Sequence, residues 1–539
     1  MANHSDVSTA DQTIVRLPSP QKLEFSASPP RILIIGAGNR GVTYARAIKN
    51  TSNGVVAGVV EPITLKRQHI GRTYIWGKRE PLEGEEFEDY RQYVSWELKR
   101  RKRAAAGEEV PEGVDAAFIC VQDSMHREVV EALAPLNLHI MCEKPLAPTL
   151  EDCVGIYKSI LPNRDVQPTR LFAVGQVLRY TPHNMLLREL LREDKVIGEI
   201  MAVHHVEPVG WNHFVHSFVR GNWRKESVSS PSLLAKCCHD IDLLYWLIAA
   251  PAPGSNIPAH VPKDISSSGS LQYFRRNRKP AEAGAATNCL SCAFEPKCQF
   301  SAKRIYTASY LAGPNQEGWK RVVCPEIEEC VTAGRPEAAQ QALLERLCQD
   351  YGDETPVHEV GQRQWYGRCV YETDNDVCDN QTVTLAWEDE PVADGEASLE
   401  SLADRSSKTA TLQMVAFSKK ICRRSTSIYG THGEIQTDGA CIIVQDFSTG
   451  QKKSHYPHVA QDDSHEDGDE GLTRAFLLAI DRIKNHGVSV TDAQRENIGC
   501  SLSDIIMGHA LVFAAEKARK SKTVVDFPDW LRKEMFQGF

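Results

Sequence analysis

The turn that contains Gly36, Gly38 and Gly41 constrains the fold of this chain more than any other feature. The apolar run Ile32–Ile35 leads directly into this Gly-x-Gly-x-x-Gly pattern, and Thr43–Ile48 after it reads as a helix. A parallel strand that helices cover on both faces needs such an unbroken apolar run. The glycines permit a tight turn, a close approach of the backbone to a pyrophosphate, and close helix packing. The stretch therefore predicts a dinucleotide site, in which the helix N-terminus holds the phosphates.

A second predicted strand, Val55–Val60, ends in Glu61. This acid lies about 20 residues beyond the last glycine, where such folds hydrogen-bond the adenosine ribose. Its carboxylate would accept from a free 2′-hydroxyl and repel a 2′-phosphate, so it favours NAD over NADP. Lys66 and Arg67 lie close enough in the sequence to keep NADP as the alternative.

Further polar residues follow the next two predicted strands, Val114–Val121 and Leu138–Cys142. Ligands of an open α/β sheet gather at the carboxyl ends of its strands. This edge predicts a set of cofactor-binding residues and, in Lys144, a candidate catalytic group. The predicted cofactor residues here are Gly36, Ala37, Gly38, Asn39, Arg40, Gly41, Glu61, Asp123, His126 and Glu143.

Beyond residue 163 the pattern changes to strands grouped around helices, which indicates a mostly antiparallel sheet. The predicted strands here are 171–177, 199–206, 381–387, 412–417, 425–429 and 440–444, and 182–192 is a predicted helix. We expect an α/β protein with a Rossmann domain followed by an α+β domain with a large, mostly antiparallel open sheet. The expected divisions are a disordered tail at 1–29, the Rossmann domain at 30–165 with a charged helical insertion at about 80–112, the second domain at 166–527 with a Cys-rich insertion at about 276–360 and an acidic loop at about 388–408, and a tail at 528–539.

Composition excludes several classes of function. The 539-residue chain has a net charge of −9, so nothing argues for binding to nucleic acid or to an anionic membrane. Its polar N-terminus has no signal-peptide core, and the apolar run 243–250 is too short to span a bilayer. Sixteen cysteines without a secretory signal indicate reduced thiols and a cytoplasmic protein.

Several motifs together resemble the Gfo/Idh/MocA family of glucose–fructose oxidoreductase and inositol dehydrogenase. They are the glycine turn, Glu143-Lys144-Pro145 after a strand, His239-x-x-Asp242 opening a helix, Arg179–Pro182, Gly198–Ile200 and Gly430–Ile435, in the family's usual order. The resemblance implies a second domain whose open sheet faces the nicotinamide and often forms a dimer or tetramer.

The resemblance also implies an NAD(P)-dependent oxidoreductase that transfers hydride between a nicotinamide and a hydroxyl or carbonyl of a sugar, a cyclitol or a sugar-derived compound. It assigns contact with the reacting hydroxyl to Lys144 and proton transfer to His239. The chemistry agrees, because hydride loss leaves a proton on oxygen that a histidine can take near pH 7. A lysine ammonium stabilises the developing alkoxide.

The chain departs from the family at one position: many relatives have an aspartate four residues before the histidine, where this chain has Ala235. Lys236 beside it could take part of that role. We expect Lys236, His213 and Asp242 at the substrate. Arg220 and Arg224 are candidates for a polyol or acidic sugar, and Arg224 also for the cofactor phosphates.

Two other functions fit the same fold. One is a glycosidase that oxidises a sugar hydroxyl transiently with tightly bound NAD. The other is a non-catalytic regulator that senses NAD, which could dispense with Lys144 and His239.

The cysteine cluster Cys289-x-x-Cys292 with Cys298 matches the spacing of metal ligands. A structural zinc there would need a fourth ligand from Cys324, Cys330 or a histidine. Free thiols, or an iron–sulfur or redox role, are the alternatives.

Overall fold

The structure is a computed structural model. It describes residues 13–16, 20–25, 28–161, 168–255, 257–311, 323–324, 326–327, 330, 333–390, 405–419, 421–457 and 467–537. Most of the predicted acidic loop at 388–408 lies outside the described residues.

The first domain is built on a six-stranded parallel sheet in the order β4-β3-β2-β5-β6-β7. The central strands are almost completely buried, as their apolar sequences require. This confirms the predicted Rossmann fold. The strands are β2 (Arg31–Ile35), β3 (Val55–Val60), β4 (Glu86–Phe87), β5 (Ala116–Ile119), β6 (His139–Cys142) and β7 (Phe172–Val174), and the helices are α1 (Asn39–Thr51), α2 (Thr64–Ile70), α3 (Tyr90–Ala105), α4 (His126–Leu133) and α5 (Leu150–Ile160).

The charged segment at 80–112, predicted as a helical insertion, contains a helix and also an edge strand of this sheet. It supplies the edge strand β4 and the helix α3, which begins where the Asp89 side chain accepts from the Arg91 N–H. Tyr93 and Trp96 of α3 pack on Phe87 of β4. One face of the helix is therefore bound to the domain, while its charged face is exposed.

The first domain also takes chain from beyond the predicted boundary at residue 165. β7 pairs in parallel with β6, and its predicted place in the second sheet was wrong. The helix α16 (Gly468–His486) packs on α1, and its Phe476 meets Phe118 of β5 edge to face. Short α17 (Val490–Ala493) follows it.

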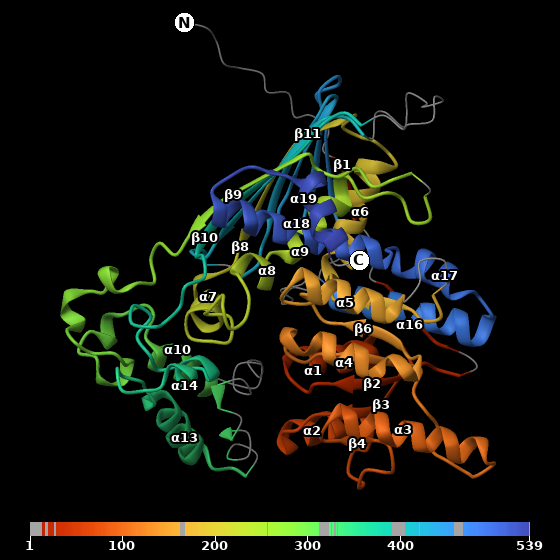
Figure 1. Cartoon of the computed structure of the whole chain (residues 1–539). Coiled ribbons are helices and arrows are strands. Elements are labelled where there is room, and N and C mark those ends of the chain that lie inside the picture. Colours follow the sequence, from red (N-terminus) through yellow and green to blue (C-terminus); the bar gives the residue numbers. More distant parts are fainter. Residues whose placement is uncertain are drawn as a thin grey trace, which may run out of the picture.

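The second domain has a ten-stranded sheet in the order β1-β15-β14-β13-β12-β8-β11-β10-β9-β16 (Figure 1). Its pairs are antiparallel except β8 with β11 and β1 with β15, which confirms a mostly antiparallel sheet. Helices α9 and α18 pack against it. The strands are β1 (Thr13–Arg16), β8 (Ile200–Pro208), β9 (Asp264–Ser270), β10 (Asn380–Trp387), β11 (Lys408–Val415), β12 (Ser425–Gly430), β13 (Gly433–Thr437), β14 (Ile442–Asp446), β15 (Lys452–Tyr456) and β16 (Val525–Asp526), and the helices are α6 (Pro182–Arg192), α7 (Trp211–Phe214), α8 (Ser232–Ala235), α9 (Cys238–Ile248), α18 (Leu502–Ser521) and α19 (Phe527–Gln537).

Both predicted tails contain regular structure. Thr13–Arg16 forms β1 at the edge of the large sheet, and Phe25 is buried against the first domain. At the other end α19 follows β16, and its Phe527 is fully buried. Residues 13–16 and 527–537 are therefore parts of the folded domains.

The Cys-rich insertion lies between β9 and β10, at the lower left in Figure 1. Its described residues form short 3₁₀ turns and the helices α10 (Ala302–Leu311), α13 (Pro336–Cys348) and α14 (Val357–Gln362), and add no strand to either sheet. It packs beside α7 and the π-helical turn η5 (Val215–Val219).

Across the described ranges, no single helix has both the length and the apolar character to cross a membrane. One pair of helices, Val490–Ile498 and Leu502–Ser521, passes that test together with a 49° bend between them.

Candidate active site

The glycine turn has the geometry of a phosphate cradle. Gly36 has a φ of +95°, and a Cβ on Gly41 would stand 2.0 Å from the Gly36 carbonyl oxygen. A Cβ on Gly38, by contrast, would meet nothing within 4 Å. No side chain caps the N-terminus of α1, which begins at Asn39. The open space at Gly38 and the backbone N–H groups at the start of α1 fit a dinucleotide pyrophosphate.

Glu61 lies beside this turn at the end of β3, as predicted. Its carboxylate accepts from the Ala37 N–H (2.8 Å) and from the Ile63 N–H (3.0 Å), and the residue is 7% exposed. These two bonds fix the carboxylate at the glycine turn and leave further lone pairs for a ribose hydroxyl.

Arg40 and Glu143, both predicted to bind the cofactor, form a network within the protein. The Glu143 carboxylate accepts from Arg40 Nε (2.8 Å) and from the Tyr44 hydroxyl (2.6 Å), while Arg40 also pairs with Asp469 of α16. Burial disfavours the charged form of Glu143, but Arg40 and Tyr44 outweigh it and lower the pKa of this carboxyl. The network joins the glycine turn to the Glu-Lys-Pro loop.

Lys144 and His239 reach the same edge of the first sheet from two domains. Lys144 Nζ donates to the Ala235 carbonyl at the end of α8 (2.9 Å). The ring of His239 on α9 bonds through Nδ1 to Gln176 Oε1 (3.1 Å). Gln176 follows β7, where the Gly175 N–H bonds to the carbonyl of Cys142, the residue before Glu143. The two predicted catalytic residues are thus held at the adjoining ends of β6 and β7.

Two buried histidines hold the loop that carries Lys144. His126, predicted to bind the cofactor, directs its ring nitrogens to backbone carbonyls, Nδ1 to Pro145 O (3.0 Å) and Nε2 to Val121 O (3.3 Å). His509 of α18 bonds through Nδ1 to Ile505 O (2.9 Å), and its Nε2 accepts from the Leu146 N–H (2.8 Å). Asp123, also predicted to bind the cofactor, lies three residues before His126, and its side chain accepts from the Ser124 N–H.

Sequence reasoning missed His509 and Gln176. His509 is 363 residues away from its partner Leu146 along the chain, so no spacing connects them. Gln176 falls inside the segment 171–177, which the sequence predicts as a strand of the second sheet, so the sequence did not place it at the edge of the first sheet.

Asp242 and Arg224 have structural partners that account for their charges. Both carboxylate oxygens of Asp242 are bound by Arg179, each at 2.7 Å, in a buried pair. Arg224 pairs with Asp374 (2.7 Å) and donates to the Val360 carbonyl, both outside the nucleotide domain. These partners satisfy the buried charges, and the roles of Asp242 at the substrate and of Arg224 at the cofactor phosphates stay predictions.

Lys236 belongs to a buried charged network below α9. Its Nζ lies 2.8 Å from Cys422 Sγ and 3.6 Å from Glu207 Oε1. Arg424 joins Glu207 to Asp240, the residue that follows His239. His213 lies on α7, edge to face with Phe218.

The structure gives no support to a zinc ion held by Cys289, Cys292 and Cys298. Within the ranges that the structure describes, no three His, Cys, Asp or Glu side chains are arranged to hold one metal ion. Neither Cys324 nor Cys330 lines the cavity around the first three cysteines. Cys369 does so instead.

Residues 30–161 match the family model of the Gfo/Idh/MocA oxidoreductases, described as an NAD-binding Rossmann fold. The first domain is therefore similar to the NAD-binding domain of this family. Its place in the fold, with the glycine turn, Glu61 and Lys144 at one sheet edge, agrees with this match.

Two curated relatives illustrate the similarity. The chain is 29% identical over 135 residues to 2,7-anhydro-N-acetylneuraminate hydratase of Escherichia coli K12, covering 25% of this chain and 34% of the hydratase. It is 23% identical over 215 residues to inositol 2-dehydrogenase of Salmonella typhimurium, covering 40% of this chain and 53% of the relative. The chain therefore spans about a third to a half of these relatives' lengths.

Solved structures match over both domains. An oxidoreductase from Agrobacterium radiobacter, crystallised with NAD+, L-tartaric acid and magnesium, gives a TM-score of 0.54 at 13% identity and covers 93% of this chain and 100% of its own. Levoglucosan dehydrogenase in complex with NADH and levoglucosan gives a TM-score of 0.55 at 13% identity, covering 93% and 99%. These likenesses establish the two-domain fold.

Proposed function

We propose that this protein is an NAD-dependent oxidoreductase that oxidises a hydroxyl, or reduces a carbonyl, on a sugar, a cyclitol or a sugar-derived compound. The observation that carries the proposal is the convergence of Lys144 and His239, from separate domains, on the sheet edge that holds the glycine turn. The named activities of the inositol and levoglucosan dehydrogenases support the substrate class.

The contacts of each residue support a separate role in the reaction. An NAD held by its pyrophosphate at the glycine turn would supply the hydride acceptor. Lys144 would donate a hydrogen bond to the substrate oxygen and stabilise negative charge there. His239, oriented by Gln176, would take the hydroxyl proton. Glu61 favours NAD, because a 2′-phosphate would meet its fixed carboxylate.

The proposal is tested with a panel of polyols and sugars assayed for NAD reduction by the full chain. With an active substrate, Lys144→Met and His239→Gln each lower kcat/KM by roughly 10²- to 10⁴-fold, the range of a positioned acid or base. Lys99→Met, at an exposed position on α3, is the matched control and keeps full activity. Failure to bind NAD(H) or NADP(H) in a titration would contradict the proposal.

A second candidate is a reaction in which the sugar is oxidised only transiently, and the hydratase relative is what favours it. Such an enzyme would convert its substrate without net NADH formation. Measuring NADH and product together separates the two. A regulator that senses NAD is a third case, and it would keep its function in the Lys144 and His239 variants.

We further infer a cytoplasmic homo-oligomer that assembles through the large sheet, as a dimer or tetramer, without nucleic acid or membrane partners. The outer side of this sheet and its ends expose Met201, Phe417 and Tyr429. Burying such side chains between copies would remove apolar area from water. Light scattering of the purified protein measures the assembly, and a monomer at all concentrations would contradict it.

A further inference from the structure

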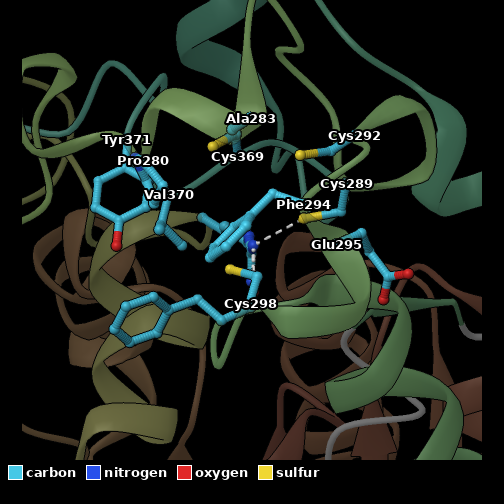
Figure 2. A pocket seen from close by; sticks show the side chains of 12 residues that line it. Pro280, Ala283, Cys289, Cys292, Phe294, Glu295, Cys298, Cys369, Val370 and Tyr371 are labelled. Carbon is cyan, nitrogen blue, oxygen red and sulfur yellow. Dashed lines mark hydrogen bonds between the residues drawn. The ribbon is translucent and has the colours of Figure 1, made fainter.

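Four cysteines line one cavity in the insertion between β9 and β10 (Figure 2). Cys289, Cys292 and Cys298 come from successive 3₁₀ turns, and Cys369 arrives from a segment about seventy residues later in the chain. None of the four forms a disulfide. Cys292 and Cys298 are partly exposed, so the cavity has a route to solvent.

The sulfur of Cys289 faces hydrogen-bond donors. Cys289 Sγ accepts from the Ala302 N–H at 3.4 Å. Donors aimed at sulfur favour the thiolate, which is the form that binds metals.

A buried cation completes this environment. Arg220 is 0% exposed and lines the cavity, with Nη2 3.4 Å from Cys289 Sγ and 2.8 Å from the Phe300 carbonyl. Its Nη1 is buried and has no hydrogen-bond partner. A buried guanidinium needs compensating negative charge. No carboxylate pairs with Arg220 among the described residues, whereas several thiolates on a metal centre would supply that charge.

Four cysteine thiolates are the ligand set of a cubane iron–sulfur cluster. No three of them are arranged to hold a single ion, which a zinc site would require. In a cubane iron–sulfur cluster each cysteine binds a different iron, so the four sulfurs stand farther apart than around one ion. We propose that Cys289, Cys292, Cys298 and Cys369 bind a [4Fe–4S] cluster, with Arg220 as its buried counter-cation.

Transfer of a preformed [4Fe–4S]²⁺ cluster from a donor is a ligand exchange that needs no net redox step. Four thiols lose their protons to water and form four Fe–S(Cys) bonds, while the four ligands of the donor leave the irons. Cluster binding therefore releases the thiol protons.

The cluster would fasten the insertion to the second domain. The insertion contributes no strand to either sheet, and Arg220 follows η5 in the second domain. Joining Cys369 to the earlier cysteines closes a long loop, which stabilises the fold by restricting the unfolded chain. The proposal is independent of the dehydrogenase activity.

The test is anaerobic purification of the full chain, followed by assays of iron, acid-labile sulfide and zinc. We expect four irons and four sulfides per chain, a broad visible absorption band and a rhombic EPR signal after reduction with dithionite. Cys369→Ser loses most of the iron. Cys348→Ser, at an exposed cysteine outside the cavity, is the matched control and retains it.

Two variants of Arg220, one that keeps the positive charge and one that removes it, separate cluster binding from folding. Arg220→Lys should retain iron with a reduction potential shifted from that of the wild type, whereas Arg220→Met should lose iron. Stoichiometric zinc in place of iron, or no iron after incubation with a preformed [4Fe–4S] cluster, would overturn the proposal. So would equal iron in the Cys369→Ser and Cys348→Ser proteins.

Discussion

At the scale of single residues, Glu61 is placed to choose between the two nicotinamide cofactors. Its carboxylate is fixed by the N–H groups of Ala37 and Ile63. Glu61→Gln keeps an acceptor oxygen but removes the charge that repels a 2′-phosphate. We expect the preference for NADH over NADPH to fall by about tenfold, equivalent to about 1.4 kcal/mol. Fluorescence titrations measure both affinities, and Glu80→Gln, at an exposed site, is the control. An unchanged ratio would mean that Glu61 does not face the ribose.

His139 gives the fold a defined sensitivity to acid. Its Nδ1 accepts from the Leu171 N–H at 3.0 Å, and burial, opposed only weakly by Asp115, lowers the pKa of His139 to about 4. Between its unfolded pKa of about 6.5 and this value, the unfolded chain binds a proton that the folded chain does not. Stability is therefore lost as the pH falls through this window.

The measured quantity is the free energy of unfolding in denaturant at pH 7 and pH 5. This histidine should contribute roughly 2 kcal/mol to the loss between the two conditions. His139→Gln keeps an acceptor for Leu171 but does not titrate, so the variant should lose correspondingly less stability. If wild type and variant lose the same amount, the histidine does not control this window.

The sequence was informative about single residues only where a residue's neighbours along the chain define its role. The glycine turn, Glu61 and Lys144 follow buried strands, so their place at the sheet edge could be predicted. Asp242 and His126 could not be assigned in this way. Asp242 is 63 residues from its partner Arg179, and a motif does not show that a charge is already paired.

At the scale of elements, the buried pair of Arg179 and Asp242 connects the 3₁₀ turn η4 (Val177–Tyr180) to α9, the helix that carries His239. Asp242→Asn leaves a buried guanidinium without its counter-charge and should cost about 3–5 kcal/mol of stability. The double variant Arg179→Met with Asp242→Leu removes both charges and should recover most of that loss. Denaturant unfolding of the two single variants and the double variant measures the coupling energy. If the stability losses of the single variants add up to that of the double variant, the two side chains do not stabilise each other.

Element types were predicted better than element partners. The helix α6 has the bounds that its apolar spacing and Pro182 predict, and β10 and β12 differ from prediction by about one residue at an end. Hydrophobic periodicity defines an element, but it does not show which sheet the element joins. β7 was therefore placed in the wrong domain, although its apolar run was recognised.

At the scale of the whole molecule, the nucleotide domain is completed by chain from the C-terminal half. α16 lies against α1, and Arg40 at the glycine turn pairs with Asp469 on that helix. Contacts across more than four hundred residues leave no local pattern in the sequence. The predicted boundary near residue 165 rests on a change in the hydrophobic pattern. Such a change shows where one segment ends, but not that a later segment returns to the same domain.

Because C-terminal segments pack in both domains, we can predict which domain each core substitution destabilises. Phe476 of α16 is fully buried against Phe118 of β5, and Phe527 is equally buried in the core of the second domain. Truncating either to alanine should cost about 3–5 kcal/mol locally. In hydrogen exchange, Phe476→Ala should reduce the protection of β2, β3 and β5 and weaken NADH binding, while β10 and β11 stay protected. Phe527→Ala should show the reverse pattern. Equal loss in both sheets would mean that the two domains unfold as one cooperative unit.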